Sequence, residues 1–179
     1  MKYILPFVAF FLCYSCIPLR IAPNIKKDKV MLGKKFKRHL PKRYAFIFED
    51  HKKADEFYYY VDIKYQLHGQ DVEYNVPFEI NGKVCYFSFH EVEIPDKTLN
   101  LIPIIADELL ERKGHDRILE DSEFTRQGNW YIAVTVADNE INDCLNPEHP
   151  ARKKVLVYLR NLHEEYLNTS NYVDILFKK

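Results

Sequence analysis

Hydrophobic residues follow one another almost without a break in two segments of the chain. Residues 44–49 read Tyr-Ala-Phe-Ile-Phe-Glu, and residues 130–137 read Trp-Tyr-Ile-Ala-Val-Thr-Val-Ala. A short apolar run of this kind is typical of a strand covered on both faces, and β-branched and aromatic residues favour strands. We therefore expect both segments to be central strands of one sheet.

Asn81-Gly82 marks a β-hairpin between residues 76–80 and 83–94. Both central positions of a type I′ turn require positive φ, and this dipeptide tolerates such values best. Side chains alternate along a strand, and we expect the more apolar face of the second strand to point toward the core. That face carries Cys85, Phe87 and Phe89, whereas the opposite face carries Tyr86, Ser88, His90 and Val92.

Apolar residues recur at spacings of three and four in two further segments, which indicates amphipathic helices. The first covers residues 52–66 and follows Asp50, whose carboxylate can cap a helix. The other covers residues 146–168 and opens with Asn146-Pro147, a capping residue followed by a proline suited to the first helical position. Residues 99–112 are expected to form a third helix, and residues 115–127 a charged loop.

Two short segments complete the predicted sheet. We expect residues 30–32 to form an edge strand and residues 172–177 to form a last strand within the sheet. Because helices and strands are interspersed without strict alternation, the fold class expected is α+β, with a mixed, mostly antiparallel sheet of about five strands packed with three helices. The expected core consists of Phe46, Phe48, Phe57, Val61, Phe87, Phe89, Ile132, Val134, Leu159 and Leu162.

The composition is that of a small globular protein. Of 179 residues, 47% are apolar and 15% aromatic, which excludes collagen-like, low-complexity and wholly disordered chains. Four cysteines are too few for a disulfide-rich scaffold. The length corresponds to one domain.

The N-terminal residues have the layout of an export signal. Lys2 is followed by a nine-residue apolar segment, residues 4–12, which is too short to cross a bilayer and is typical of a signal peptide. The sequence Cys13-Tyr14-Ser15-Cys16 that follows resembles the lipobox of bacterial lipoproteins. Ser15 fits the small residue of that pattern, whereas Tyr14 and Cys13 depart from it. The resemblance implies cleavage before Cys16 and lipidation, with palmitate, of that cysteine; secretion with cleavage near Ser15 and an uncleaved anchor are the alternatives.

Charge is distributed unevenly, although the net charge of the whole chain is zero. Residues 17–43 contain ten basic residues and one acidic residue, Asp28, a net charge of +9. Residues 44–179 contain 15 basic and 25 acidic residues, a net charge of −10. The basic segment is expected to contact either an anionic membrane surface or the chain's own acidic domain. Because the N-terminal signal predicts export, we do not expect nucleic acid to be the partner of this basic segment.

Three weak constellations are the only candidates for chemistry, because the chain has no Gly-rich phosphate loop, G-x-S-x-G elbow, H-E-x-x-H or paired CxxC motif. A cysteine paired with a histidine can act as a thiolate nucleophile, and Cys144 and His149 are such a pair of residue types, beside Asp143 and Glu148. Their alternative interpretation is a loop followed by a helix cap, because Pro147 and Pro150 bracket the segment.

The second constellation is His90 with Glu91 and Glu93, whose side chains alternate between the two faces of a strand and so cannot readily share a metal ion. No metal site and no cofactor are therefore expected. The third is a set of aromatic residues that form either a stacking surface for glycans or peptides, or simply core. Its members are Tyr58, Tyr59, Tyr60, Tyr74, Tyr86 and Trp130, and the binding hypothesis expects Tyr59, Tyr60 and Tyr74 to lie together on the surface.

Once Cys16 is acylated, Cys85 and Cys144 are the two cysteines left in the domain. We expect both thiols to be free, with Cys85 buried and Cys144 the more reactive. The sequence thus predicts a signal peptide (residues 1–15), a lipid-anchored basic tether (residues 16–43) and a single α+β domain (residues 44–179). The function expected is that of a membrane-anchored envelope lipoprotein facing the periplasm or the cell exterior. Its domain is expected to be a non-catalytic structural or interaction module, the alternatives being a glycan- or peptide-binding protein and a cysteine- or metal-dependent hydrolase.

Overall fold

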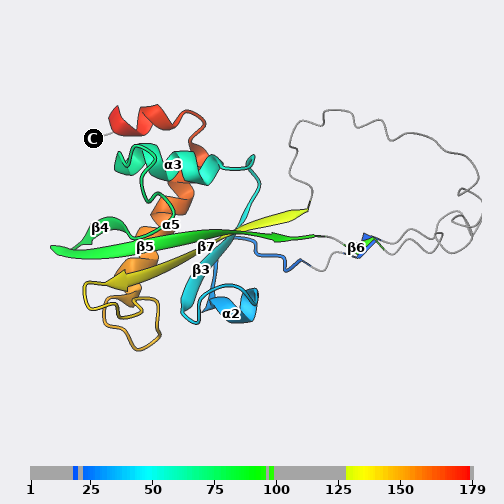
Figure 1. Cartoon of the computed structure of the whole chain (residues 1–179), viewed down its shortest axis with the longest axis horizontal. Coiled ribbons are helices and arrows are strands. Elements are labelled where there is room, and N and C mark those ends of the chain that lie inside the picture. Colours follow the sequence, from blue (N-terminus) through cyan, green and yellow to red (C-terminus); the bar gives the residue numbers. More distant parts are fainter. Residues whose placement is uncertain (1–17, 20–21, 96, 99–127, 178–179) are drawn as a thin grey trace, which may run out of the picture.

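The structure, a computed structural model, describes residues 18–19, 22–95, 97–98 and 128–177 of the chain (Figure 1). Five strands form one sheet in the order β2-β3-β7-β5-β4, and a separate pair joins β1 to β6. Every paired strand is antiparallel to its neighbour, and helices lie against the sheet, so the expected α+β class is confirmed. The strands are β1 (Pro18–Leu19), β2 (Lys29–Leu32), β3 (Tyr44–Asp50), β4 (Val76–Ile80), β5 (Lys83–Ile94), β6 (Lys97–Thr98) and β7 (Asn129–Asp138). The helices are α2 (Gly33–Phe36), α3 (Glu56–Tyr65), α5 (Arg152–Asn168) and the 3₁₀ helix η1 (Tyr172–Phe177).

The hairpin of β4 and β5 forms at the predicted dipeptide. Asn81 has φ 53° and Gly82 has φ 74°, and Ile80 pairs with Lys83 across the turn. Both central positions therefore have the positive φ of a type I′ turn. Ten of the twelve residues of β5 then pair with β7, from Cys85 opposite Asp138 to Ile94 opposite Asn129. This long register places the two strands side by side at the centre of the molecule.

The main core lies between one face of the sheet and the helices α3 and α5. Figure 1 shows α3 and η1 on one side of the strands and α2 on the other. Aromatic rings from both layers meet there, with the ring of Phe57 edge-on to those of Phe89 and Tyr166 at 4.8 and 5.0 Å. The prediction of the core is confirmed, because all ten residues named from the sequence are buried in this cluster.

The opposite face of the sheet is covered in part by the basic N-terminal segment. Ala22, Ile25 and Leu40 are buried against Ile47 and Tyr131 in a second, smaller cluster. Outside that cluster, Arg160 of α5 donates two hydrogen bonds to the carboxylate of Asp28, at 3.0 and 3.1 Å. Residues 22–43 therefore pack against the chain's own domain. The boundary predicted between a tether ending at residue 43 and a domain beginning at residue 44 lies inside this folded unit. The edge strand expected at residues 30–32 is part of this segment, as β2.

The last strand predicted from the sequence is wrong, because residues 172–177 form the helix η1. The side chain of Asn171 accepts a hydrogen bond from the Val173 amide and donates one to Asp174, which turns the backbone into a helical conformation. The ring of Tyr172 lies 5.6 Å from that of Tyr60 on α3. This segment therefore packs on a helix instead of pairing with a strand.

Both predicted helix caps are also wrong. Asp50 is the last residue of β3 and is buried, and its Oδ1 accepts hydrogen bonds from the Tyr166 hydroxyl and the Lys52 amide. Because that carboxylate is used in the core, α3 begins six residues later, at Glu56. Asn146 forms a turn with the amide of Glu148 at 3.1 Å, and α5 begins only at Arg152. The helix expected at residues 99–112, the loop at residues 115–127 and the lipidation site Cys16 lie outside the described residues.

His163 on α5 makes the stability of this core depend on pH. Its ring stacks on Phe48 at 4.0 Å, and its Nε2 is buried with no hydrogen-bond partner among the described residues. Burial lowers the pKa of His163, and the nearby carboxylates of Asp28, Glu164 and Asp50 only partly oppose this effect. The unfolded chain therefore takes up a proton at a higher pH than the native state does.

We expect the free energy of unfolding to fall as the pH drops below about 6.5, the ordinary pKa of histidine. A His163→Phe variant should show a shallower fall, because one buried neutral histidine is removed. Urea unfolding at pH 7.5 and pH 5 measures the effect, and His51→Gln, at an exposed histidine, should retain the wild-type slope. Identical slopes for wild type and His163→Phe would contradict this role of His163.

Candidate functional site

Two cysteines, a histidine and an aspartate come together where the sheet meets the loop that follows β7. Cys85 lies on β5 directly opposite Asp138, the last residue of β7. The loop then returns along the other edge of β7, because Asp143 pairs with Ala137 and the Cys144 amide donates to the Val136 carbonyl at 3.0 Å. Cys144 is thereby held beside β7, and His149 follows before α5 begins.

The distances within this cluster are short. One side-chain donor atom from each of Asp138, Cys144 and His149 lies within 4.8 Å of the others. His149 Nε2 is 3.5 Å from Asp138 Oδ2, while its Nδ1 accepts a hydrogen bond from the Ala151 amide at 3.2 Å. The other carboxylate oxygen, Asp138 Oδ1, accepts hydrogen bonds from the amides of Glu140 and Asn142, both at 2.9 Å. The loop backbone therefore fixes the carboxylate that faces His149.

The electrostatics of the cluster favour a carboxylate beside protonated thiols. Burial acts to raise the pKa of Asp138, but hydrogen bonds from Asn142, Glu140 and His149 outweigh it, and the pKa lies below its ordinary value. Burial raises the pKa of Cys144 to about 12, and the nearby Cys85 and Asp138 contribute to this rise. The pKa of Cys85 is also raised, chiefly by burial. At neutral pH both groups are therefore thiols.

Cys144 is not the reactive thiol that the sequence predicts. Its side chain is fully buried, at 0% exposure, whereas a polar loop position was expected to leave it accessible. Cys85 is buried, as expected, and both thiols are free. Because β7 lies between them, their backbones are about two strand spacings apart, roughly 9–10 Å, which exceeds the roughly 7 Å between Cα atoms that a disulfide allows.

The acidic neighbours proposed from the sequence do not join the cluster. One carboxylate oxygen of Asp143 accepts a hydrogen bond from the Tyr44 amide at 2.7 Å, and the other accepts one from the Leu145 amide at 3.0 Å. Glu148 is exposed. The residues that sequence reasoning missed are Cys85 and Asp138, since only the pairing of β5 with β7 brings them to Cys144 and His149.

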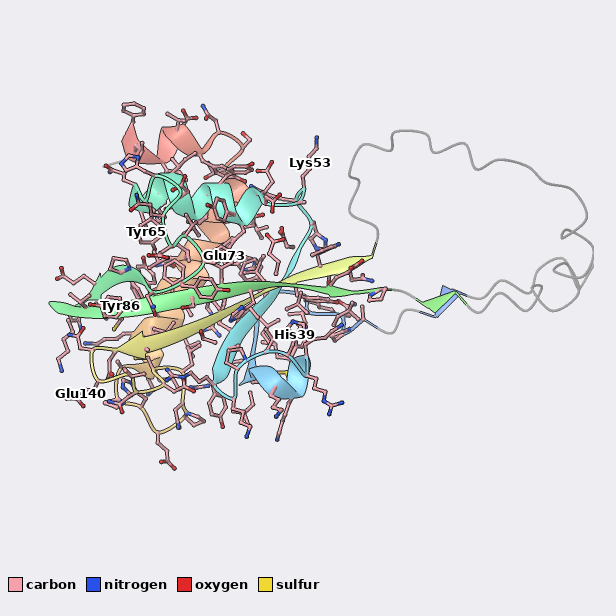
Figure 2. All side chains as sticks on the ribbon, viewed as in Figure 1. His39, Lys53, Tyr65, Glu73, Tyr86 and Glu140 are labelled. Carbon is pink, nitrogen blue, oxygen red and sulfur yellow. The ribbon has the colours of Figure 1, made fainter. Side chains whose placement is uncertain are left out.

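A cavity of about 700 Å³ opens beside this cluster, between the hairpin turn and the loop after β7. Cys85, Asp138 and His149 line it, together with Lys83 of β5 and Lys154 of α5. Figure 2 labels Glu140, another lining residue, on that loop. The cluster is therefore reachable by a small solute or an ion.

A second pocket, of about 520 Å³, lies over the part of the sheet that the N-terminal segment leaves uncovered. Tyr86, Ser88 and His90 of β5 line its floor, and Figure 2 labels Tyr86 on that strand. Tyr74 lines its wall, because the loop after α3 is attached to β5 by a hydrogen bond from the Phe89 amide to the Glu73 carbonyl at 3.0 Å. The pocket is completed by Pro41, Arg43, Asn75, Thr135, Val136, Ala137, Asp138, Asn139 and Ile141.

The aromatic residues singled out from the sequence separate into different environments. Tyr60 is buried, and the single proton of its hydroxyl is shared between the Glu165 carboxylate at 2.9 Å and the Leu162 carbonyl at 3.2 Å. The expectation that Tyr59, Tyr60 and Tyr74 form one exposed surface is therefore wrong. Tyr59 is exposed on α3, with its ring edge-on to that of Tyr58 at 5.9 Å.

His90 lies in the second pocket rather than in a metal site. Its ring is 6.2 Å from that of Tyr74, and burial lowers its pKa despite the opposing effect of Glu73. Glu91 and Glu93 fall on the other face of β5, as the alternation along a strand predicts. The same alternation places Tyr86, Ser88 and His90 together, so these three of the thirteen lining residues could be grouped from the sequence.

Comparisons of the chain with protein-family models, with curated proteins and with solved structures found no match. Function therefore has to be argued from the residues and their geometry.

Proposed function

We propose that the protein is a lipid-anchored lipoprotein of the cell envelope whose domain is a non-catalytic binding module. The proposed export and membrane location are based on Lys2, the apolar segment 4–12 and the pair Ser15-Cys16. Among the described residues no helix has both the length and the apolar character needed to cross a membrane. Attachment at the membrane is assigned to the lipid on Cys16.

The observation that carries the binding role is the pocket over the uncovered part of the sheet. It combines the tyrosine rings of Tyr74 and Tyr86 with polar side chains, among them Arg43 and Asn75, from separate segments of the chain. Carbohydrates present both C–H faces that stack on aromatic rings and hydroxyl groups that hydrogen-bond to such side chains. A glycan is therefore the ligand class that we assign to this pocket.

A binding role fits the side chains better than hydrolysis does. The best candidate nucleophile, Cys144, is fully buried and has a pKa of about 12, so its thiolate is scarce at neutral pH. His149 Nε2 faces the carboxylate of Asp138 at 3.5 Å. These contacts supply no activated thiolate, which is why we favour a module without catalytic activity.

The chain offers a matched control for the lipid anchor, because Cys13 lies three residues before Cys16. In cells fed a clickable palmitate analogue, we expect wild type and Cys13→Ala to be labelled and Cys16→Ala to lose the label. The reason is that only the cysteine after Ser15 becomes the acylated N-terminus. Equal labelling of all three proteins would rule out Cys16 as the acceptor.

The chain also offers a matched control for glycan binding, because Tyr59 and Tyr74 are similarly exposed, at 55% and 52%. On an array of soluble oligosaccharides, any glycan that wild type binds should bind about tenfold more weakly to Tyr74→Ala, which lacks one stacking ring. Tyr59→Ala, on α3, should bind like wild type. Binding that Tyr74→Ala retains in full, or a wild-type protein that binds no glycan on the array, would contradict the proposal.

A further inference from the structure

We propose that Cys85, Cys144, His149 and Asp138 form a binding site for a divalent transition-metal ion of the zinc class. Asp138 borders both this site and the glycan pocket, but Cys85, Cys144 and His149 do not line that pocket, and the metal site does not depend on glycan binding. Two thiols, one imidazole and one carboxylate are together a complete set of four ligands for tetrahedral Zn²⁺. Sulfur and imidazole donors select such ions over Mg²⁺ and Ca²⁺, which prefer oxygen ligands.

The spacing of the donors is close to what a tetrahedral ion requires. Bond lengths of about 2.0–2.3 Å to zinc place neighbouring ligand atoms about 3.3–3.8 Å apart. In the structure the donor atoms of Asp138, Cys144 and His149 lie within 4.8 Å of one another. Cys85 lies on β5 opposite Asp138, and its thiol interacts with that of Cys144, which makes it the candidate for the fourth donor. Movements of about 1 Å would bring the first three donors to bonding distance, and rotation of the Cys85 side chain would supply the fourth.

The carboxylate of Asp138 is the negative charge at the centre, although Lys83 and Lys154 line the same cavity. Its Oδ1 is held by the amides of Glu140 and Asn142, and its Oδ2 faces His149. A divalent ion stabilises the thiolates that it coordinates and displaces their protons. Binding of the ion at the two cysteines therefore releases protons.

His149 can enter the coordination sphere through the nitrogen that faces the centre. In the metal-free state Nδ1 accepts the Ala151 amide proton, so the neutral ring carries its own proton on Nε2, toward Asp138. Coordination through Nε2 moves that proton to Nδ1 and releases the amide of Ala151. This amide precedes the first turn of α5, where N–H groups lack helical partners and can bond to water.

The bound ion would join two parts of the fold that are far apart in sequence. Cys85 belongs to the β4–β5 hairpin, whereas Cys144 and His149 belong to the loop between β7 and α5. The adjacent cavity of about 700 Å³ gives the ion a route to Cys85, Asp138 and His149. We therefore expect the metal to stabilise this end of the sheet.

The test uses Co²⁺ as a spectroscopic probe for Zn²⁺. The full chain is purified in detergent in a Cys13→Ser, Cys16→Ser background, so that Cys85 and Cys144 are its only thiols. We expect an equimolar amount of Co²⁺ to produce the near-ultraviolet thiolate-to-cobalt absorption and the visible bands of a tetrahedral site. Zn²⁺ should abolish both sets of bands and should raise the thermal unfolding midpoint.

Variants at the ligands show whether these residues hold the ion. Cys144→Ser and Cys85→Ser should each remove about half of the thiolate absorption, and His149→Gln should weaken Co²⁺ binding at least 100-fold. Glu148→Gln is the matched control, because it removes an exposed charge from the same loop but no proposed ligand and no cavity-lining residue, and it should bind like the parent. Circular dichroism checks that each variant is folded, and His149→Gln serves where a buried serine prevents folding.

The proposal is overturned if the parent shows no thiolate absorption, or shows it only with Co²⁺ in large excess. It is also overturned if folded Cys144→Ser or His149→Gln binds Co²⁺ as the parent does. Neither result would affect the glycan array, whose readout depends on Tyr74 and not on the metal.

Discussion

Lys52→Met is expected to destabilise the protein by about 2–4 kcal/mol. The ammonium of Lys52 donates hydrogen bonds to the carbonyls of Tyr166 and Thr169, at 2.5 and 2.6 Å, and to the hydroxyl of Tyr172 at 3.2 Å. It also lies 4.4 Å from the centre of the Tyr166 ring. Both carbonyls lie at the C-terminal end of α5, where that of Tyr166 otherwise accepts only the Thr169 amide that the structure shows at 3.4 Å.

Methionine keeps the apolar stem of the side chain but removes the ammonium donor from both carbonyls, of which that of Tyr166 keeps the long bond from the Thr169 amide. An unsatisfied buried polar group costs about 1–3 kcal/mol, and the cation–π contact contributes about 0.5–2 kcal/mol more. The two effects overlap, which is why the expected total is below their sum. Urea unfolding at neutral pH, followed by circular dichroism, measures the loss.

Lys53→Met makes the same chemical change one residue away. Figure 2 shows Lys53 pointing away from the rest of the molecule, and its side chain is exposed. A surface substitution of this kind usually changes stability by no more than about 0.5 kcal/mol. If both variants lose the same amount, the hydrogen bonds of Lys52 do not stabilise the end of α5.

Leu159→Ala is expected to cost about 2–5 kcal/mol, the usual range for a buried leucine cut to alanine. Leu159 is 1% exposed and belongs to the core cluster between α5 and the sheet. Alanine removes part of that packing, and the rigid rings around the site limit how far the cavity can close. The loss is read from the same unfolding curves.

Val157→Ala provides the comparison on the same helix, because Val157 is 57% exposed. Alanine has the higher helix propensity and Val157 contributes little to the core, so we expect a change within about 0.5 kcal/mol. A loss of less than about 1 kcal/mol of unfolding free energy for Leu159→Ala would mean that the apolar face of α5 does not stabilise the core.

Local signals in the sequence were enough to predict the central part of the fold. Positive φ at Asn81 and Gly82 depends only on those two residues, so the hairpin turn was found at its correct position. Alternation along residues 83–94 likewise assigned Phe87 and Phe89 to the core. Apolar runs located β3 and β7, because a strand covered on both faces has few polar positions.

Helix ends were harder to predict, because a capping residue can be used elsewhere. Asp50 has the side chain of a helix cap, but the hydroxyl of Tyr166, which is 116 residues away, binds it in the core. Residues 172–177 have a pattern compatible with a strand, yet the edge-on contact of Tyr172 with the ring of Tyr60 on α3 favours a helix there. In both places a contact between distant segments outweighs the local preference.

The candidate sites depend still more on tertiary structure. The sequence identified Cys144 and His149, but it paired them with Asp143 and Glu148, their neighbours along the chain. Only the return of the loop along β7 brings the donor groups of Asp138, Cys144 and His149 within 4.8 Å of one another, and only the strand register sets Cys85 opposite Asp138. Local sequence determines which face of a strand a side chain occupies, whereas the pairing of strands decides which residues of other segments it meets there.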